Sequence, residues 1–215
     1  MSAKSVSLCA VVISRYDLLR EMLESALTNG YPLQRICVID NGQDLKRLES
    51  ALQVARSFDT AVMSFTPHEV FGLAEAWNWF IETISEERLI VGDDIVFKKP
   101  GTIQRMVETP GDFVTAKWFG CFIIRDSCIN KVGTFDETIS PGYLYFEDID
   151  YAQRMMLSNV PITQLDLGVF HHGSASLKVI PEHEMQTRHH DRFLRAQANY
   201  VKKWGSIPSW IPQDI

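Results

Sequence analysis

The first 65 residues alternate between short apolar runs and stretches with helical spacing, and this alternation constrains the fold more than any other feature. Continuous apolar runs occupy 6–13, 36–39 and 60–65, and runs of this length are typical of strands buried on both faces. Between them, 18–27 and 45–57 carry apolar residues at helical spacing. The order β-α-β-α-β predicts a parallel sheet with right-handed crossovers, and therefore an α/β protein.

The remainder of the chain continues this pattern. We expect helices at 70–82, 103–107 and 126–132, a helix through 155–157, and a helix over 182–204. We expect strands at 89–91, 95–97, 113–118, 121–124 and 162–170. A length of 215 residues fits a single domain with a full core. We therefore predict one domain over 1–215, with a mostly parallel central sheet flanked by helices.

Composition narrows the classes of function. A formal net charge of -6 and a pI near 5.5 argue against binding to duplex nucleic acid, which needs a basic face. No apolar run approaches the roughly 20 residues that span a bilayer, and the N-terminus lacks a signal-peptide pattern. Cys9, Cys37, Cys121 and Cys128 show no CxxC spacing. We expect reduced, mostly buried thiols in a cytoplasmic protein, with peripheral attachment to the inner face of a membrane left open.

Two adjacent carboxylates, Asp93 and Asp94, follow a predicted buried strand and Gly92. Ligands bind at the carboxyl ends of strands in open α/β sheets, and hard oxygen ligands there suit Mg²⁺ or Mn²⁺ and, with the metal, a diphosphate. The alternative is an exposed turn between two strands. The dipeptide alone does not decide between a metal site and a turn.

Other polar residues follow the predicted strands. Ser14 and Arg15 come after the first strand, and Asp40 begins an Asp-Asn-Gly turn after the second. This turn is either a plain turn or a nucleotide contact at the strand end. Gly72, at the entry of the helix predicted over 70–82, would allow a ligand to approach backbone amides, and Asn78 lies further along that helix.

A second acidic group, Glu147, Asp148 and Asp150, precedes a helix about 55 residues after the first. Acids at a helix N-terminus are favoured by the macrodipole, so capping is one interpretation. The other is a general base, because the aromatic and apolar residues before Glu147 can raise the pKa of a neighbouring carboxylate. A metal-assisted transfer with a separate base requires two such acidic groups.

Two further stretches carry candidate residues. His171 and His172 end the predicted strand over 162–170 and point opposite ways if that strand continues, so at most one faces a site. Trp118, Phe119 and Gly120 are either packing residues or a platform for a sugar ring. The tail histidines, His183, His189 and His190, are expected on a solvated helix face.

The combined pattern resembles the nucleotide-sugar glycosyltransferases of family 2, with the GT-A fold, close to a rhamnosyltransferase-like bacterial branch. The similarity covers nearly the whole chain, and the order and spacing of its short strings carry it. The strings are Val11–Arg15, Val38–Gly42, Gly72–Asn78, Gly92–Asp94, Cys121–Arg125, Val132–Glu137, Tyr145–Asp150, Phe170–Gly173 and Lys203–Gly205.

The resemblance implies a role for each candidate. It divides the chain into a nucleotide-sugar-binding half (1–97), an acceptor and catalytic half (98–181), and a C-terminal helix and tail (182–215). The resemblance implies that the donor is bound by Ser14, Arg15, Asp40, Gly72, Asn78 and Asp93, and that the metal is bound by Asp94 and His171. It implies that Asp148 is the general base and that Glu147 orients the sugar or the acceptor. The residues that would border the acceptor are Trp118, Phe119 and Gly120.

The implied activity is an inverting sugar transfer, dependent on Mn²⁺ or Mg²⁺, from a UDP- or dTDP-linked donor to a hydroxyl of a glycan, lipid-linked glycan or other biopolymer. The sequence departs from the family pattern at three positions. Gly92 replaces an acidic or amide residue, Ser14 replaces an asparagine, and Ala76 stands where many members carry an arginine. A nucleotidyltransferase and a catalytically weak nucleotide-sugar-binding module remain alternatives, and a modified nucleic acid is a further possible acceptor.

Overall fold

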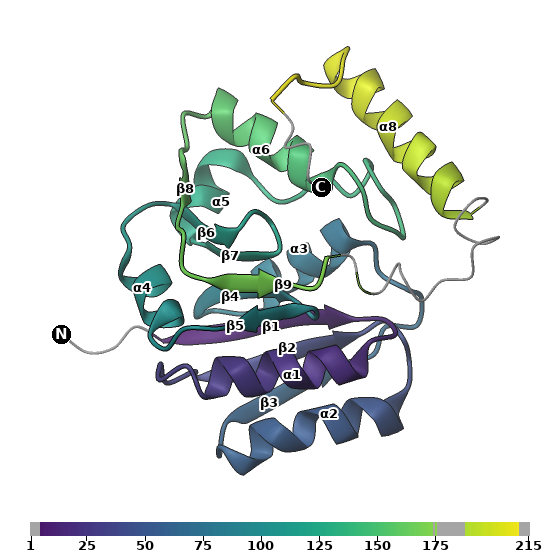
Figure 1. The fold of residues 1–215 in the computed structure, drawn as a ribbon. Coiled ribbons are helices and arrows are strands. Elements are labelled where there is room, and N and C mark those ends of the chain that lie inside the picture. The colour runs from purple at the N-terminus through teal and green to yellow at the C-terminus, as the bar shows by residue number, and fades with distance from the viewer. Residues whose placement is uncertain (1–4, 174, 176–187, 211–215) are drawn as a thin grey trace.

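The computed structural model describes residues 5–173, 175 and 188–210, and its centre is a seven-stranded sheet (Figure 1). The strand order is β3-β2-β1-β4-β7-β6-β8. These strands are β1 (Val6–Val12), β2 (Arg35–Asp40), β3 (Ala61–Phe65), β4 (Glu87–Gly92), β6 (Phe113–Lys117), β7 (Cys121–Ile124) and β8 (Ile162–Gln164). Strands β1 to β4 are mutually parallel, as is the pair β6 and β8, whereas β7 runs antiparallel to β4 and β6. The predicted mostly parallel sheet is confirmed.

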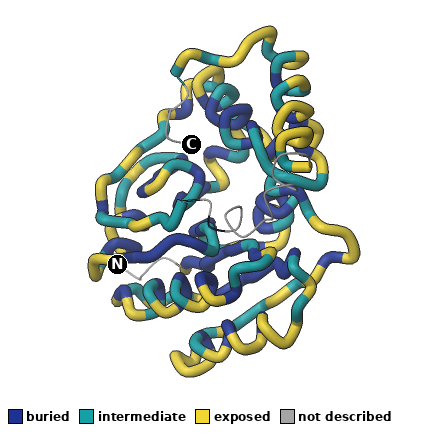
Figure 2. The backbone as a smooth tube through the Cα atoms, turned by 45° about the vertical axis from the view of Figure 1, so that its right-hand side comes forward, coloured by how far each residue is buried: buried dark blue, intermediate teal, exposed yellow. Residues whose placement is uncertain are grey.

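Helices cover both faces of the sheet. They are α1 (Tyr16–Leu27), α2 (Leu45–Ser57), α3 (Leu73–Thr83), α4 (Thr102–Glu108), α5 (Asp126–Val132), α6 (Glu147–Leu157) and α8 (His190–Trp204). One apolar cluster joins the sheet to α1, α2 and α4, and a second joins it to α3, α5 and α6. Alternate residues of β1 enter the two clusters, Leu8 and Ala10 on one face and Cys9 on the other. Most residues of the central strands β1, β2 and β4 are buried (Figure 2), and the four cysteines are buried and unbridged, as expected.

The prediction of one strand over 162–170 is wrong. The segment forms two short strands in different sheets: β8 pairs with β6, whereas β9 (Val169–His171) pairs antiparallel with β5 (Ile95–Phe97) in a separate two-stranded sheet. Gly168 between them has a φ of 68°, a conformation that favours glycine and interrupts an extended chain. This break carries His171 away from the large sheet and beside Ile95, the first residue of β5.

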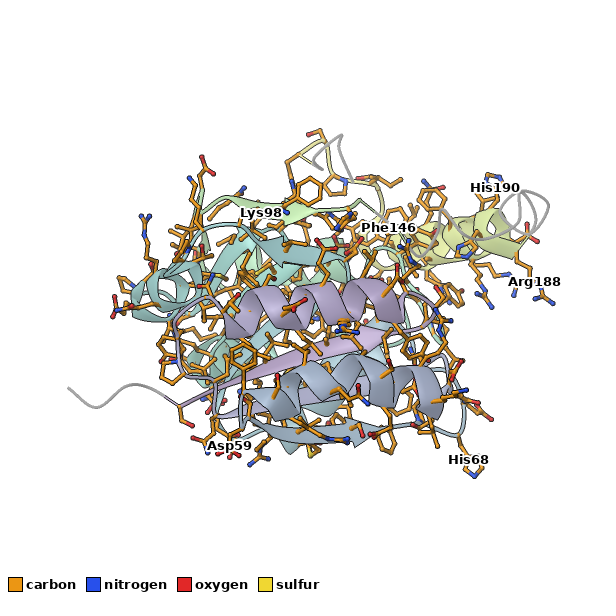
Figure 3. All side chains as sticks on the ribbon, turned by 60° about the horizontal axis from the view of Figure 1, so that its bottom comes forward. Asp59, His68, Lys98, Phe146, Arg188 and His190 are labelled. Carbon is orange, nitrogen blue, oxygen red and sulfur yellow. The ribbon has the colours of Figure 1, made fainter. Side chains whose placement is uncertain are left out.

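Helix α8 packs against the beginning of α6. Phe146 and Ile149 form an apolar cluster with Ala196 and Tyr200 of α8, and Figure 3 shows Phe146 where α8 meets the rest of the domain, with Arg188 and His190 at the far end of that helix. The predicted tail helix is thus present from His190 to Trp204, and its first part, including His183, lies outside the described residues. Within the described residues, no helix has the length and apolar character needed to cross a membrane.

Candidate active site

The carboxyl ends of three adjacent strands converge on one cavity. The parallel registers place Val12 of β1 beside Asp40 of β2, and Val11 beside Gly92 of β4, so the polar residues after these strands share an edge of the sheet. A cavity of about 640 Å³ opens there. Its walls include the candidates Ser14, Gly92, Asp93, Asp94, Phe119, Gly120 and His171, together with Asn41, Tyr143, His189 and Arg192, which were not candidates.

The two predicted metal ligands lie together in this wall, although they are far apart in the sequence. The Nε2 atom of His171 lies 3.1 Å from Oδ1 of Asp94, and the Ala175 amide donates to Oδ2 at 3.2 Å. Burial is the largest single influence and favours the neutral acid, but the hydrogen bond from His171, its charge and the hydrogen bond from the Ala175 amide together outweigh burial and lower the pKa of Asp94. His172 points away, with Nε2 3.3 Å from Glu21. The expectation that at most one of the two histidines faces the site agrees with this arrangement.

The donor set fits a hard divalent ion that is shared with a substrate. No group of three or more histidine, cysteine, aspartate or glutamate side chains that could hold a metal occurs among the described residues. Mg²⁺ is commonly bound by one or two carboxylates, with substrate phosphates and water completing the shell. Asp94 and His171 would supply the protein's share of such a shell if the ion replaced their direct contact.

Asp93 and Gly92 lie beside Asp94 at the carboxyl end of β4. Burial, and then the charge of Asp94, raise the pKa of Asp93 to about 7, while Arg15 opposes the shift. Gly92 donates its amide to the Gly120 carbonyl at 2.8 Å. A Cβ at Gly92 would lie 3.2 Å from Oδ1 of Asp94, a crowded contact. Glycine therefore leaves room for the Asp94 carboxylate.

Asp40, predicted to contact the donor, is buried and does not line the cavity. It is fully buried, and Tyr16 donates its hydroxyl to Oδ1 at 2.5 Å. The next residue, Asn41, lines the cavity instead and exchanges two hydrogen bonds with the backbone of Phe71. Arg15 is also absent from the wall and pairs with Asp17 at 2.6 Å.

Gly72 and Asn78 hold a neighbouring segment and do not line the main cavity. The amide of Gly72 donates to Glu75 at 2.5 Å, and a Cβ on Gly72 would lie 2.9 Å from the carbonyl of Ser140. Asn78 bonds to both backbone groups of Phe135 at 2.8 and 2.9 Å. The space that the sequence suggested for a ligand at Gly72 is filled by residues 140–143.

The second acidic group begins α6 after two residues with left-handed backbone. Tyr145 and Phe146 have φ values of 120° and 66°. Glu147 accepts from the amide of Tyr145 at 2.6 Å, and Asp148 accepts from the indole Nε1 of Trp118 at 2.8 Å. Non-glycine residues in this region are uncommon and occur often at functional sites. This turn places Asp148 against Trp118. Glu147, Asp148 and Trp118 do not line the cavity themselves, but Trp118 directly precedes the wall residues Phe119 and Gly120.

Burial raises the pKa of both carboxyl groups. For Glu147 the charge of Asp148 adds to the shift. For Asp148 the hydrogen bonds from Trp118 and from the Ile149 amide oppose it. Burial and hydrogen bonding therefore act in opposite directions on the pKa of Asp148, and a carboxyl group whose pKa is raised above its ordinary value is a stronger base once ionised.

Asp150, the third acid of the group, makes contacts that hold two helices together. It is fully buried and accepts from Arg154, Lys203 and Trp204 at 2.7 to 2.9 Å. Asp150 therefore fastens the C-terminal end of α8 to α6, and neither helix capping nor catalysis describes its contacts.

One expectation for the tail needs correction. His189 was expected on a solvated face, but it is half-buried in the cavity wall, with Nδ1 3.2 Å from the Tyr145 hydroxyl. Arg192, one turn further on, places its guanidinium 5.7 Å from the centre of the Tyr143 ring. The docking of α8 turns part of its polar face toward the cavity, and sequence periodicity cannot distinguish that face from a solvated one.

Comparisons with known proteins show the fold. No protein-family model matches the chain, and no curated sequence matches it significantly. Among solved structures, it is similar to the mannosyltransferase PcManGT from Pyrobaculum calidifontis in complex with GDP-Man and Mn²⁺, with a TM-score of 0.69 and 16% identity over 97% of this chain and 67% of that chain. It is also similar to residues 1–349 of S. aureus TarS, with a TM-score of 0.55 and 14% identity over 75% of this chain and 58% of TarS.

A third structure, HddC from Yersinia pseudotuberculosis, has a TM-score of 0.56 and 10% identity over 81% of this chain and 96% of that chain. All three identities are low, so the similarity concerns the arrangement of helices and strands. The predicted fold class is confirmed: a single α/β domain of the GT-A type, with a mostly parallel sheet flanked by helices.

Proposed function

We propose that the protein is a glycosyltransferase that moves a sugar from a nucleoside-diphosphate donor to an acceptor hydroxyl. The observation that carries this proposal is the pairing of Asp94 with His171 in the wall of a large cavity at the carboxyl ends of β1 and β4. The similarity to a mannosyltransferase that binds GDP-Man and Mn²⁺ adds support. We further propose that the donor is UDP- or dTDP-linked and that the protein belongs to glycosyltransferase family 2.

In this proposal the nucleotide occupies the cavity. Val11, Ile13 and Phe71 give its wall an apolar part that can contact a base, and Asn41 fixes the loop that carries Phe71. Asp94 and His171 would hold a Mn²⁺ or Mg²⁺ ion. When bound, the ion would neutralise charge on the departing nucleoside diphosphate.

Asp148 is the general base of the proposed reaction. It takes the proton of the acceptor hydroxyl as the hydroxyl oxygen bonds to the anomeric carbon and the bond from that carbon to the phosphate oxygen breaks. A single displacement from the opposite face inverts the anomeric configuration. Glu147 holds the turn before α6 through its bond to the Tyr145 amide, and Phe119 and Gly120 border the place where an acceptor would enter.

The test of the proposed function is calorimetric titration with UDP, GDP and dTDP, with and without Mn²⁺. We expect one diphosphate to bind in the presence of Mn²⁺, and we expect Asp94→Asn to weaken that binding roughly 10- to 100-fold, because a carboxylate ligand becomes a neutral amide. Glu21→Gln is the matched control, since Glu21 contacts His172 and is absent from the cavity wall. Binding of none of the three nucleotides would contradict the proposal.

The alternative of a binding module without catalysis makes a different prediction. Such a module would bind the nucleotide sugar with Mn²⁺ but would not release the nucleoside diphosphate, either to water or to an added acceptor. Measuring diphosphate release from the bound donor therefore separates the two functions. A nucleotidyltransferase would instead release pyrophosphate from a nucleoside triphosphate.

The hydrogen bond from Trp118 gives a pH prediction. In Trp118→Phe the indole N–H that stabilises the charged form of Asp148 is lost, so the pKa of Asp148 rises and less base is present at a given pH. We expect the rising limb of kcat/KM against pH to move upward by about one unit, the equivalent of about 1.4 kcal/mol. Trp79→Phe is the control, because Trp79 stacks on Phe65 away from Asp148. An unmoved limb would exclude Asp148 as the titrating base.

A further inference from the structure

The described wall of the cavity contains one permanently charged cation, Arg192. The other charged or titratable side chains there are Asp93, Asp94, Tyr143, His171 and His189. A nucleoside diphosphate carries several negative charges, and a metal ion held by Asp94 and His171 would be partly neutralised by Asp94 itself. The proposed donor therefore needs a further positive group beside its phosphates.

Two positions expected to supply that charge do not do so. Ala76, where related sequences are expected to carry an arginine, is fully buried in the apolar cluster between α3 and the sheet. A cation at that position would enter the core. Arg15 lies outside the cavity wall, and its guanidinium is held by Asp17 at 2.6 and 2.9 Å.

The surroundings of Arg192 favour the binding of an anion. It projects from the first turn of α8, where a cation is unfavourable with respect to the helix macrodipole and a nearby anion is favourable. No carboxylate among the described residues lies within ion-pair distance of it, and its guanidinium lies over the face of the Tyr143 ring. Tyr143 is itself part of the cavity wall, so the aromatic ring directs the guanidinium toward the cavity.

The position of Arg192 is fixed by contacts at both ends of α8. Near its beginning, His189 contacts the Tyr145 hydroxyl, and Phe193 packs on the Tyr145 ring with centroids 5.3 Å apart. Further along, Asn199 donates to the carbonyl groups of Thr138 and Ile139 at 3.2 and 3.1 Å. The helix is therefore attached to the same segment that carries Glu147 and Asp148.

We propose that Arg192, with His189 beside it, binds the diphosphate of the nucleotide-sugar donor and supplies from α8 the positive charge that α3 lacks. This inference rests on the proposed function. It assigns donor recognition to a helix distant in sequence from the strand ends, and it makes docking of α8 a condition for tight donor binding.

The test compares Arg192→Gln with Arg195→Gln. Arg195 is, like Arg192, an exposed arginine of α8, but it is absent from the cavity wall. Each variant is titrated with the nucleoside diphosphate that the unaltered protein binds and with the corresponding nucleoside. We expect Arg192→Gln to weaken diphosphate binding about 10- to 100-fold and to leave nucleoside binding within about twofold. Arg192→Lys should recover part of the loss, and Arg195→Gln should bind as the unaltered protein does.

The outcomes distinguish this inference from the function on which it rests. Equal diphosphate affinity in Arg192→Gln and the unaltered protein would overturn the role of Arg192 and leave the proposed function intact. Equal losses in both arginine variants would also overturn it, because they would indicate a general charge effect. Failure of the unaltered protein to bind any nucleoside diphosphate would overturn the proposed function together with this inference.

Discussion

Asp148→Asn is expected to lower the rate of sugar transfer about 10³-fold while leaving the affinity for the nucleoside diphosphate within about twofold, since general-base catalysis commonly contributes 10²- to 10⁴-fold. The amide has nearly the same shape and can still accept the hydrogen bond from Trp118, but it cannot take a proton from the acceptor. The measurement is release of nucleoside diphosphate from the donor sugar, followed in parallel with calorimetric binding.

Two comparisons make this result specific. Glu147→Gln should retain more activity than Asp148→Asn, because Glu147 is committed to the Tyr145 amide and orients the turn. Thermal unfolding of each variant shows whether a loss of activity follows a loss of structure. Full activity in Asp148→Asn would remove Asp148 from the mechanism, and a parallel loss of nucleotide affinity would mean that it acts through the donor site.

The regular elements could be predicted from the sequence because their apolar patterns are local. Residues 45–57, 121–124 and 126–132 were predicted with the bounds found for α2, β7 and α5. The prediction for segment 162–170 is wrong because a local pattern cannot show which strands a segment pairs with. Its pattern is compatible with an extended chain throughout, but the positive φ at Gly168 and the separate partners of its two halves depend on tertiary structure.

The candidate site was only partly accessible to sequence reasoning. Order and spacing suggested Asp94 and His171, and the fold brings them to 3.1 Å. The sequence could not show that the hydroxyl of Tyr16 meets the carboxylate of Asp40, since that contact depends on how α1 packs beside β2. It also could not show that Arg192 enters the cavity wall, because a polar helix face looks the same whether it meets solvent or a cavity.

The attachment of α8 is where we expect the largest effect on stability. Asp150 is fully buried, and its two oxygens accept from Arg154, Lys203 and Trp204. In Asp150→Ala the two cations lose a common partner in a poorly solvated place, and the indole N–H loses its acceptor. Removing one member of a buried ion pair commonly costs about 3–5 kcal/mol, and we expect a loss in that range in the free energy of unfolding.

Asp136→Ala provides the comparison, since it removes another carboxylate from the same lysine. Asp136 contacts Lys203 at 2.7 Å, but its side chain is 26% exposed. Water can therefore replace much of that contact, and we expect a loss of about 1 kcal/mol. Urea unfolding of both variants, followed by the emission of Trp204 and the other tryptophans, measures the difference. Equal losses would show that the buried position of Asp150 adds nothing.

The same variant connects stability to donor binding. Arg192 reaches the cavity because α8 is fixed to α6 and to the turn that carries Asp148, so loosening the helix at Asp150 should also weaken binding of the nucleoside diphosphate. Nucleoside binding, which does not require the guanidinium, should change much less. If Asp150→Ala were destabilised but bound the diphosphate as tightly as the unaltered protein, α8 would be a stabilising element only, and the phosphate charge would have to be met from elsewhere in the cavity.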